Sequence, residues 1–365
     1  MIRTKNRVRL GAVVAVLAMS VAACGSTTAN DSAADSSSTP ESQTSAPAQE
    51  PATNSSDAGT PDAATNQSSA GSVALGKDTV IAIIAKGFQN QYWVAVKNGA
   101  QAEADAKGVS ITFEGPQTEN DVEQQAQLFT TAVARHPSAI AIAALDSKGF
   151  GPLLEKAKDA QIPVIAFNNS IESDIPVTTA STDNFAAAQA AAQHLADLLK
   201  HTGVVGVMAY SQTSESGIAR RDGFVDWMTK NEPNIKLLPV VYDDSDLQKA
   251  ADLTKAMIAA NSDLTGIFAA NEVSALGVLT GVKESKNTGL TIVGFDSGKA
   301  QKDAIRSGVI SGSITQNPVG MGAQIVDSAI AALTGQKQDK VIDTGFEWYD
   351  ASNVDDPKIA PLLYD

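Results

Sequence analysis

Polar side chains directly follow four short apolar runs in this 365-residue sequence. Asn168 and Asn169 follow one run, Asn271 and Asp296 follow two others, and Gln316 ends the fourth. Amides donate and accept hydrogen bonds, and carboxylates accept them. Together these side chains have the chemistry to bind the hydroxyl groups of a small polar molecule.

A fifth loop, after the apolar run 80–85, combines a cation, an amide and two rings. It contains Lys86, Asn90, Tyr92 and Trp93, although only 5% of all residues are aromatic. Flat rings pack against the apolar faces of sugar or polyol carbons, while polar groups fix the ligand's orientation. This loop is therefore a candidate part of the same binding site.

Each of these residues also has a purely structural interpretation. Asparagines are common in turns and at the first residue of a helix, and Asp296 could cap a helix that begins near residue 297. Tyr92 and Trp93 could pack into the core beneath the helix that follows them. The coincidence of five such loops favours a binding site.

The elements that would position these residues alternate between strands and helices. We expect strands at 79–85, 110–114, 139–144, 163–167, 178–180, 204–209, 236–242, 266–270, 291–295 and 311–315. Apolar residues recur at the spacing of a helix in 92–107, 119–135, 150–160, 185–201, 220–231, 246–261, 274–285 and 319–334. This alternation indicates βαβ units and parallel sheets, whose ligands bind beyond the carboxyl ends of the strands.

The length of the alternating part indicates two lobes. Residues 78–365 exceed what a single hydrophobic core usually organises. The predicted fold class is α/β, with two doubly wound parallel-sheet lobes.

The first residues predict export. Four basic residues within 1–9 precede an uncharged, largely apolar run at 10–23, which is shorter than the ~20 residues that span a bilayer. Residues 1–23 therefore resemble a lipoprotein signal peptide, and Cys24 would become the acylated first residue. The alternative is an ordinary secretory signal with a chance cysteine. Because Cys24 is the only cysteine, the chain can form no internal disulfide and no thiolate metal cluster.

Residues 24–77 are predicted to form a disordered tether. They are rich in Ser, Thr, Ala, Pro, Asn and Asp and have few large apolar side chains, so they cannot bury enough surface to offset chain entropy. Asn54 and Asn66 fit the glycosylation triplet, but a bacterial export signal argues against glycans.

The charge of the chain argues against nucleic acid as a partner. Its formal charge is −14, and removal of residues 1–23, with four basic and no acidic residues, would make it four units more negative. Such a chain is repelled by nucleic acid and by anionic lipid headgroups.

No catalytic constellation stands out. His136, His194 and His201 lack metal-ligand spacing, and no phosphate-binding glycine motif is present. We therefore expect no enzyme, no cofactor and no metal. The acidic run 243–246 leaves two interpretations, a calcium site or a solvated helix N-terminus favoured by the helix dipole.

Residues 78–365 resemble the type 1 periplasmic binding proteins, in the ribose- and galactose-binding branch that shares its fold with LacI-type repressors. The resemblance rests on 90–100, on the inter-lobe crossing 180–184, and on four further motifs: Arg220-x-x-Gly223-Phe224, Ala270-Asn271-Glu272, Val293-Gly294-Phe295-Asp296 and Gln316-Asn317-Pro318. It implies that Arg220, Asn271 and Asp296 bind sugar and that Gln316 is a hinge residue that also contacts ligand. It also implies a three-strand hinge between lobe one at 78–182 plus 317–345 and lobe two at 183–316 plus 346–365.

The departures from the family pattern concern ligand identity. Asn168 and Asn169 stand where ribose binders have an acidic residue followed by arginine. Lys86 replaces a small hydroxyl residue, Ala143 a binding asparagine, and Ser245 a frequent aromatic. The sugar-binding frame is thus kept, while ribose itself is doubtful.

The resemblance implies an extracytoplasmic solute-binding lipoprotein of an ABC importer, which captures a monosaccharide or small polyol by cleft closure and acts as a monomer. Its partners would be the ligand, the permease, and the membrane through the lipid anchor. A receptor of the same fold that signals to a membrane kinase or chemoreceptor is the alternative. The many amides favour a neutral ligand. Lys86 and Arg220 give two positive charges to the single carboxylate of Asp296, and this excess would also suit an anion.

Overall fold

The computed structural model describes residues 75–287 and 289–365, within a compact unit that spans Ser68–Asp365. The predicted signal peptide, Cys24 and nearly all of the predicted tether lie outside the described residues. No helix in the described ranges is long and apolar enough to cross a membrane.

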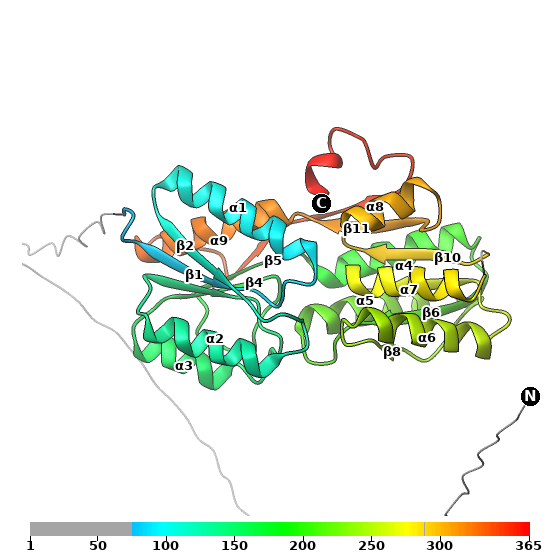
Figure 1. Ribbon diagram of the computed structural model, residues 1–365, viewed down its shortest axis with the longest axis horizontal. Helices are drawn as coiled ribbons and strands as arrows, with labels where there is room; N and C mark the ends of the chain where they lie inside the picture. Colours follow the sequence, from blue (N-terminus) through cyan, green and yellow to red (C-terminus); the bar gives the residue numbers. More distant parts are fainter. Residues whose placement is uncertain (1–74, 288) are drawn as a thin grey trace, which may run out of the picture. The chain divides into compact units, whose positions relative to one another are not determined.

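The first lobe is built on a six-stranded parallel sheet in the order β12-β5-β4-β3-β1-β2. Its strands are β1 (Val80–Ile84), β2 (Ser110–Glu114), β3 (Ala139–Ile142), β4 (Val164–Phe167), β5 (Thr178–Ser181) and β12 (Val341–Asp343). Helices α1 (Gln91–Lys107) and α9 (Pro318–Leu333) cover one face, and α2 (Val122–Ala134) and α3 (Gly151–Asp159) cover the other (Figure 1). Ile81 and Ile83 pack under the first pair, and Ala82 and Ile84 under the second, as strand alternation requires.

The second lobe has a seven-stranded sheet in the order β13-β11-β10-β9-β6-β7, with β8 paired to β6. Its strands are β6 (Gly203–Ala209), β7 (Ile235–Leu237), β8 (Val241–Tyr242), β9 (Gly266–Ala269), β10 (Thr291–Phe295), β11 (Gly312–Gln316) and β13 (Phe346–Tyr349). All pairs are parallel except β11 with β13.

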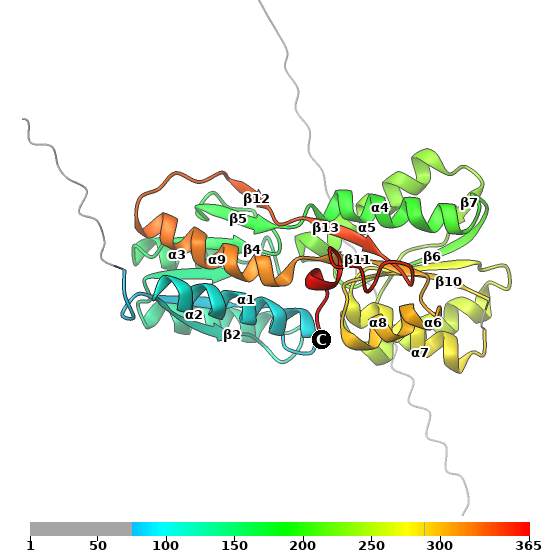
Figure 2. The same ribbon diagram turned by 90° about the horizontal axis from the view of Figure 1, so that it is seen from above.

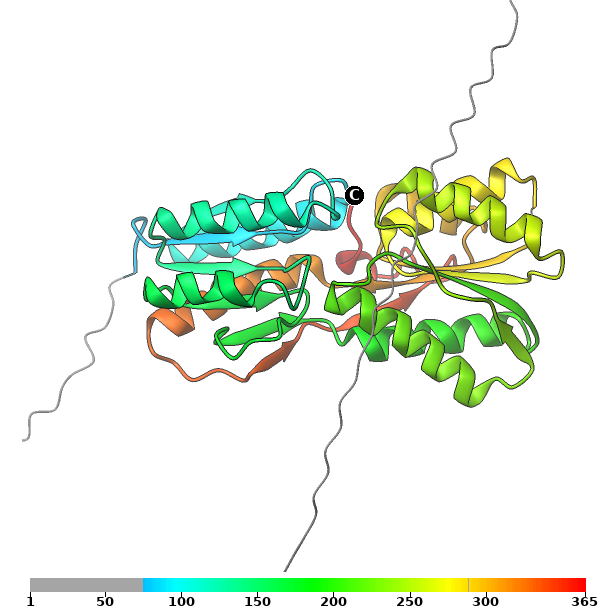
Figure 3. The same ribbon diagram turned by 90° about the horizontal axis from the view of Figure 1, so that it is seen from below.

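Helices again cover both faces of this sheet (Figure 2). One face carries α4 (Asn184–Leu198) and α5 (Glu215–Asn231), and the other carries α6 (Leu247–Ala260), α7 (Glu272–Glu284) and α8 (Lys299–Arg306). Figure 3 shows the same two layers from the opposite side. The predicted α/β fold with two parallel-sheet lobes is confirmed.

Three short segments join the lobes. They are residues 182–183 between β5 and α4, residue 317 between β11 and α9, and residues 344–345 between β12 and β13. The first and third are hydrogen-bonded to each other, because Thr182 Oγ1 donates to the Gly345 carbonyl at 3.2 Å and the Thr344 amide donates to the Ser181 carbonyl at 3.1 Å.

Helices α1 and α9 approach each other through glycine. A Cβ at Gly99 would collide with the Val319 carbonyl oxygen, and a Cβ at Gly322 with the Val96 carbonyl oxygen. The two backbones therefore touch where any other residue would hold them apart.

Apart from shifts at the ends of elements, the structure differs from the predicted elements in three places. The predicted strand 236–242 is split into β7 and β8 by a segment that contains Pro239, which has no N–H to donate to a sheet. Helix α8 was not predicted, because it is only eight residues long and half of them are charged. Strands β12 and β13 were also missed, since both are edge strands without a continuous apolar run.

Candidate functional site

Side chains from both lobes enclose one small pocket beyond the carboxyl ends of β1, β4, β9, β10 and β11. Nine of the ten predicted site residues line it, together with Glu119 and Tyr210. The nine are Lys86, Asn90, Tyr92, Trp93, Asn168, Arg220, Asn271, Asp296 and Gln316. Parallel strands end at the same edge of a sheet, so residues far apart in the sequence meet there.

Asn169 is the predicted residue that does not line this pocket. Its amide nitrogen donates to Ser147 Oγ at 3.1 Å and to the Ser170 carbonyl at 2.9 Å. The reason lies in Asn168, whose left-handed backbone (φ 66°) turns the chain away directly after the strand. Asn169 therefore supports the loop and does not face the pocket.

Asp296 and Arg220 form the polar centre of the pocket. One carboxylate oxygen of Asp296 accepts from Gln316 Nε2 at 2.6 Å, and the other accepts from the Glu272 amide at 3.1 Å. Arg220 Nη1 lies 3.8 Å from the latter oxygen, and both side chains are only 3% exposed. Both lie in the cleft between the lobes, where side chains of both lobes cover them.

Arg220 is held in place on several sides. Its Nε donates to Asn184 Oδ1 at 2.8 Å, and its Nη1 donates to the Ala270 carbonyl at 2.9 Å. The guanidinium lies 3.6 Å from the centre of the Phe295 ring. A cation over an aromatic face is attracted by the ring quadrupole, so the orientation of Arg220 is fixed without a ligand.

Lys86 connects the two lobes. It follows β1, and its ammonium group donates to Ser214 Oγ at 2.7 Å and to Ser216 Oγ at 2.9 Å at the start of α5. Burial lowers the pKa of Lys86 to about 7, against the opposing effect of nearby Glu119. A buried cation at a helix N-terminus is unfavourable unless such polar partners surround it.

Tyr92 and Trp93 serve as core residues and as pocket walls at once. Each is 2% exposed and belongs to the core cluster beneath α1, and their rings meet edge to face at 4.9 Å. Tyr92 Oη accepts from Asn168 Nδ2 at 3.2 Å. The structural and functional interpretations of these rings are therefore compatible.

The asparagines at the loop ends are also helix caps. Asn90 accepts from the Tyr92 amide at 2.8 Å, and Asn271 accepts from the Ser274 amide at 2.8 Å while its Nδ2 donates to Ser245 Oγ at 2.9 Å. Asp296, in contrast, does not cap the next helix, because Gly298 is the residue before α8.

Asn168 and Asp296 both adopt left-handed backbone conformations, with φ of 66° and 76°. Such conformations cost energy in residues other than glycine and are concentrated at functional sites. Of the nine such residues in the described part of the chain, these two follow β4 and β10 directly, and both of their side chains line the one pocket.

The sequence model of one family, described as the periplasmic binding protein domain, matches residues 81–337. The chain belongs to this family. A D-ribose/D-allose-binding protein of Pseudomonas aeruginosa is 25% identical over 280 residues, which cover 73% of this chain and 87% of that protein.

Two solved structures of this family from Agrobacterium vitis are also similar. One solute-binding protein, with bound D-fucose, is 31% identical, has a TM-score of 0.75, and covers 78% of this chain and all of its own. The other, bound with alpha-D-tagatopyranose, is 33% identical, has a TM-score of 0.76, and covers 78% of this chain and 99% of its own.

Two pocket residues of this periplasmic binding protein were not predicted. Glu119 was assigned to the first turn of a helix, but that helix begins at Val122. Glu119 Oε1 accepts a hydrogen bond from Trp93 Nε1 at 2.6 Å. Burial raises the pKa of Glu119. Tyr210 directly follows β6, so the strand-end criterion that found the other residues would also have found it.

The pocket is nearly filled by its own side chains. Only about 10 Å³ remains free between them, which is roughly the space for one water molecule. A larger molecule can bind only if the lobes, or the side chains between them, move apart first.

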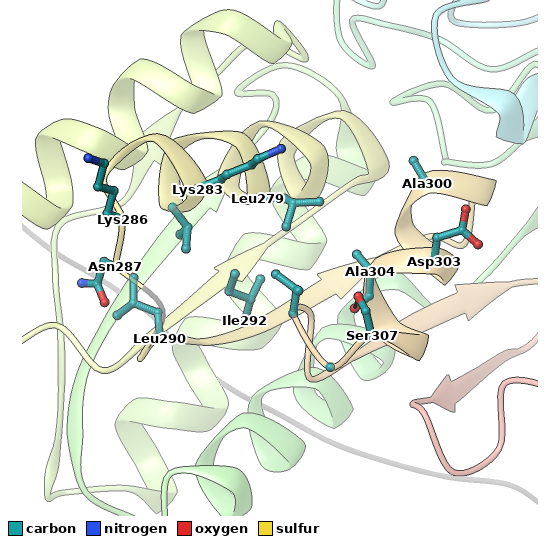
Figure 4. Close-up of a pocket in the computed structure, with 13 residues that line it drawn as sticks. Leu279, Lys283, Lys286, Asn287, Leu290, Ile292, Ala300, Asp303, Ala304 and Ser307 are labelled. Carbon is teal, nitrogen blue, oxygen red and sulfur yellow. Dashed lines mark hydrogen bonds between the residues drawn. The ribbon is translucent and has the colours of Figure 1, made fainter.

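A different pocket of about 780 Å³ lies between α7 and α8 near the start of β10 (Figure 4). Its walls are largely apolar, with Leu279, Leu290 and Ile292 among them, and Lys283 and Asp303 are among its few charged residues. It lies at the opposite end of β10 from Asp296. It lacks the convergent polar groups that orient a hydroxyl-rich ligand.

The acidic run 243–246 directly precedes helix α6. Asp246 is its capping residue and accepts from the Lys249 amide at 2.8 Å. Among residues 75–287 and 289–365, no three His, Cys, Asp or Glu side chains are grouped so that they could hold a metal ion.

Proposed function

We propose that this chain is the extracytoplasmic sugar-binding component of an ABC importer, and that it captures a neutral monosaccharide or small polyol between its two lobes. The pocket carries this proposal: amides, rings and balanced charges from both lobes converge there. The relatives named above, whose names or bound ligands are sugars, support it.

Glu119 supports a neutral ligand. The sequence had suggested two cations, Lys86 and Arg220, against one carboxylate, and that excess would also suit an anion. With Glu119 in the lining, two carboxylates face two cations. An added negative charge would then meet a balanced site, whereas hydroxyl groups can both donate to and accept from the surrounding amides.

Cleft closure is the proposed mechanism. Lobe one, comprising 78–182 plus 317–345, and lobe two, comprising 183–316 plus 346–365, would separate by bending at the three crossing segments. A ligand gains contacts from Asp296 and Arg220 on one side and from Tyr92 and Asn168 on the other only when the cleft is shut. It therefore shifts the equilibrium toward the closed form, which the permease would recognise.

Thermal unfolding of the purified chain tests the ligand class. The probes are D-ribose, D-allose, D-fucose and D-tagatose, with D-galacturonate as an acidic analogue. A ligand present at 100 times its dissociation constant adds about 2.7 kcal/mol of stability, which raises the midpoint by several degrees.

The outcomes separate the alternatives. A shift with a neutral sugar supports the proposal, and a shift with the acid alone overturns the neutral-ligand claim. If no small carbohydrate shifts the midpoint, the transport proposal fails and the signalling receptor becomes the better hypothesis.

A further inference from the structure

The segment after β13 returns from lobe two to lobe one. Residues 350–365 form turns and a short 3-10 helix, Ala360–Leu362, drawn in red in Figure 2. Val354 and Ile359 belong to the core cluster of lobe two. Tyr364, however, belongs to the core cluster of lobe one, beneath α1 and α9.

Tyr364 contacts both lobes with different parts of its side chain. Its ring lies 6.0 Å from the Tyr92 ring in an edge-to-face arrangement. Its hydroxyl donates to Glu272 Oε2 at 3.1 Å and accepts from the Ser297 amide at 3.2 Å, both in lobe two. Tyr364 is 6% exposed. It is a noncovalent link between the lobes, in addition to the three crossing segments and the contacts of Lys86.

The lobe-two partners of Tyr364 are direct neighbours of pocket residues. Glu272 follows Asn271, and its backbone amide donates to the Asp296 carboxylate. The peptide group between Asp296 and Ser297 is held on both sides, because its carbonyl accepts from Tyr349 Oη at 2.7 Å and its N–H donates to Tyr364 Oη. These two hydrogen bonds hold the peptide group directly after Asp296, whose backbone is left-handed.

We propose that Tyr364 is a positioning residue for ligand binding: it holds the closed arrangement of the lobes and fixes Tyr92 and Asp296 without lining the pocket itself. The role of Tyr364 in ligand binding rests on the proposed function. Its role as a link between the lobes can be tested on the ligand-free chain.

The binding test compares Tyr364→Phe with the parent chain by calorimetry, with D-ribose, D-allose, D-fucose and D-tagatose as probes. Loss of one buried hydroxyl with two partners should weaken binding roughly three- to tenfold. Tyr364→Ala also removes the ring contact to Tyr92 and should weaken binding more than tenfold. The matched control is Asp365→Asn, which weakens the ion pair with Lys302 in lobe two (2.5 Å) and should leave affinity unchanged.

The closure test measures the distance between nitroxide labels on the ligand-free chain. Lys97→Cys on α1 and Gln248→Cys on α6 place exposed labels on the two lobes, with Cys24→Ser removing the native thiol. Tyr364→Ala should shift the distance distribution toward longer values, Tyr364→Phe less so, and Asp365→Asn not at all.

The two failures are distinguishable. If the parent chain binds none of the probes, the proposed function fails, while the label distances still test the link. If Tyr364→Phe and Tyr364→Ala fold with parent-like melting, bind within twofold of the parent and keep its label distances, the positioning role is overturned.

Discussion

At the residue scale, side chains that stabilise the fold also form the pocket. Asn90 and Asn271 cap helices with one atom and line the pocket as well, and Tyr92 belongs to the core cluster of lobe one. A substitution here therefore changes packing and binding together. Useful variants keep the backbone geometry and remove one chemical property.

Asp296→Asn is such a variant. Asparagine tolerates the left-handed backbone better than most residues, so the fold should survive, whereas Asp296→Ala would add backbone strain. Loss of the charged acceptor should cost about 1.5–3 kcal/mol of binding, or roughly ten- to more than a hundredfold in affinity. Calorimetry with a sugar that binds the parent chain measures this. Asp303→Asn, on the exposed side of α8, is the matched control, and equal affinity in both variants would contradict the role of Asp296.

A second prediction concerns Glu272 and pH. Burial, with Asp296 nearby, raises the pKa of Glu272 from its usual 4.5 to about 8, although Lys302 and the Tyr364 hydroxyl act against the rise. Between these values the folded state keeps a proton that the unfolded state releases, so Glu272 makes the free energy of unfolding fall as pH rises through this window.

Glu272→Gln removes that dependence. Urea unfolding at pH 5 and pH 7 should show a smaller loss of stability with rising pH in the variant than in the parent. Asp243, whose pKa burial raises to about 7, contributes a slope of the same sign that remains in both proteins. An unchanged difference between the two pH values would refute the assignment.

At the element scale, the alternation of strands and helices was predictable, and so were the strand ends that carry chemistry. Parallel strands are buried on both faces, so they appear in the sequence as apolar runs, and a polar residue directly after such a run is conspicuous. Short elements and edge strands have no continuous apolar run, so their ends do not stand out in the sequence. For that reason β12, β13 and α8 were missed, and Glu119 was hidden in a helix assigned three residues too early.

The glycines in the motifs have a physical reason that the sequence alone did not reveal. Gly99, in the motif around Trp93, lies where α1 touches α9, and Gly223, in the motif of Arg220, lies where a Cβ would meet the Phe185 carbonyl of α4. Which helix pairs come into contact depends on tertiary packing, and helical spacing does not specify it.

Gly99→Ala tests this packing. The added methyl group meets the backbone of Val319, which cannot rotate away, so α1 and α9 must separate. We expect a loss of about 1–3 kcal/mol and a melting midpoint lower by a few degrees. Gly151→Ala in α3 is the matched control, because a Cβ there meets no atom within 4 Å, and it should not destabilise. Equal melting of both variants would contradict the close contact.

At the scale of the whole molecule, one prediction concerns the attachment of the chain to the membrane. The predicted anchor, Cys24, lies outside the described residues. Cys24 should carry the acyl chains, because residues 1–23 resemble a lipoprotein signal peptide. Mass spectrometry of the N-terminus from a native membrane fraction measures this. A soluble mature chain that begins elsewhere would contradict the anchor, while Cys24→Ser should release the protein from the membrane.

The return of the chain to lobe one has a consequence for biogenesis. The first sheet acquires β12, and one of its faces acquires α9, only after the entire second sheet except β13 has been synthesised. Until then Ile81, Ile83 and Val96 lack the cover that Met321 and Ile325 provide. A chain that emerges with its N-terminus first therefore cannot complete lobe one until α9 and β12, which follow nearly all of lobe two, have also emerged.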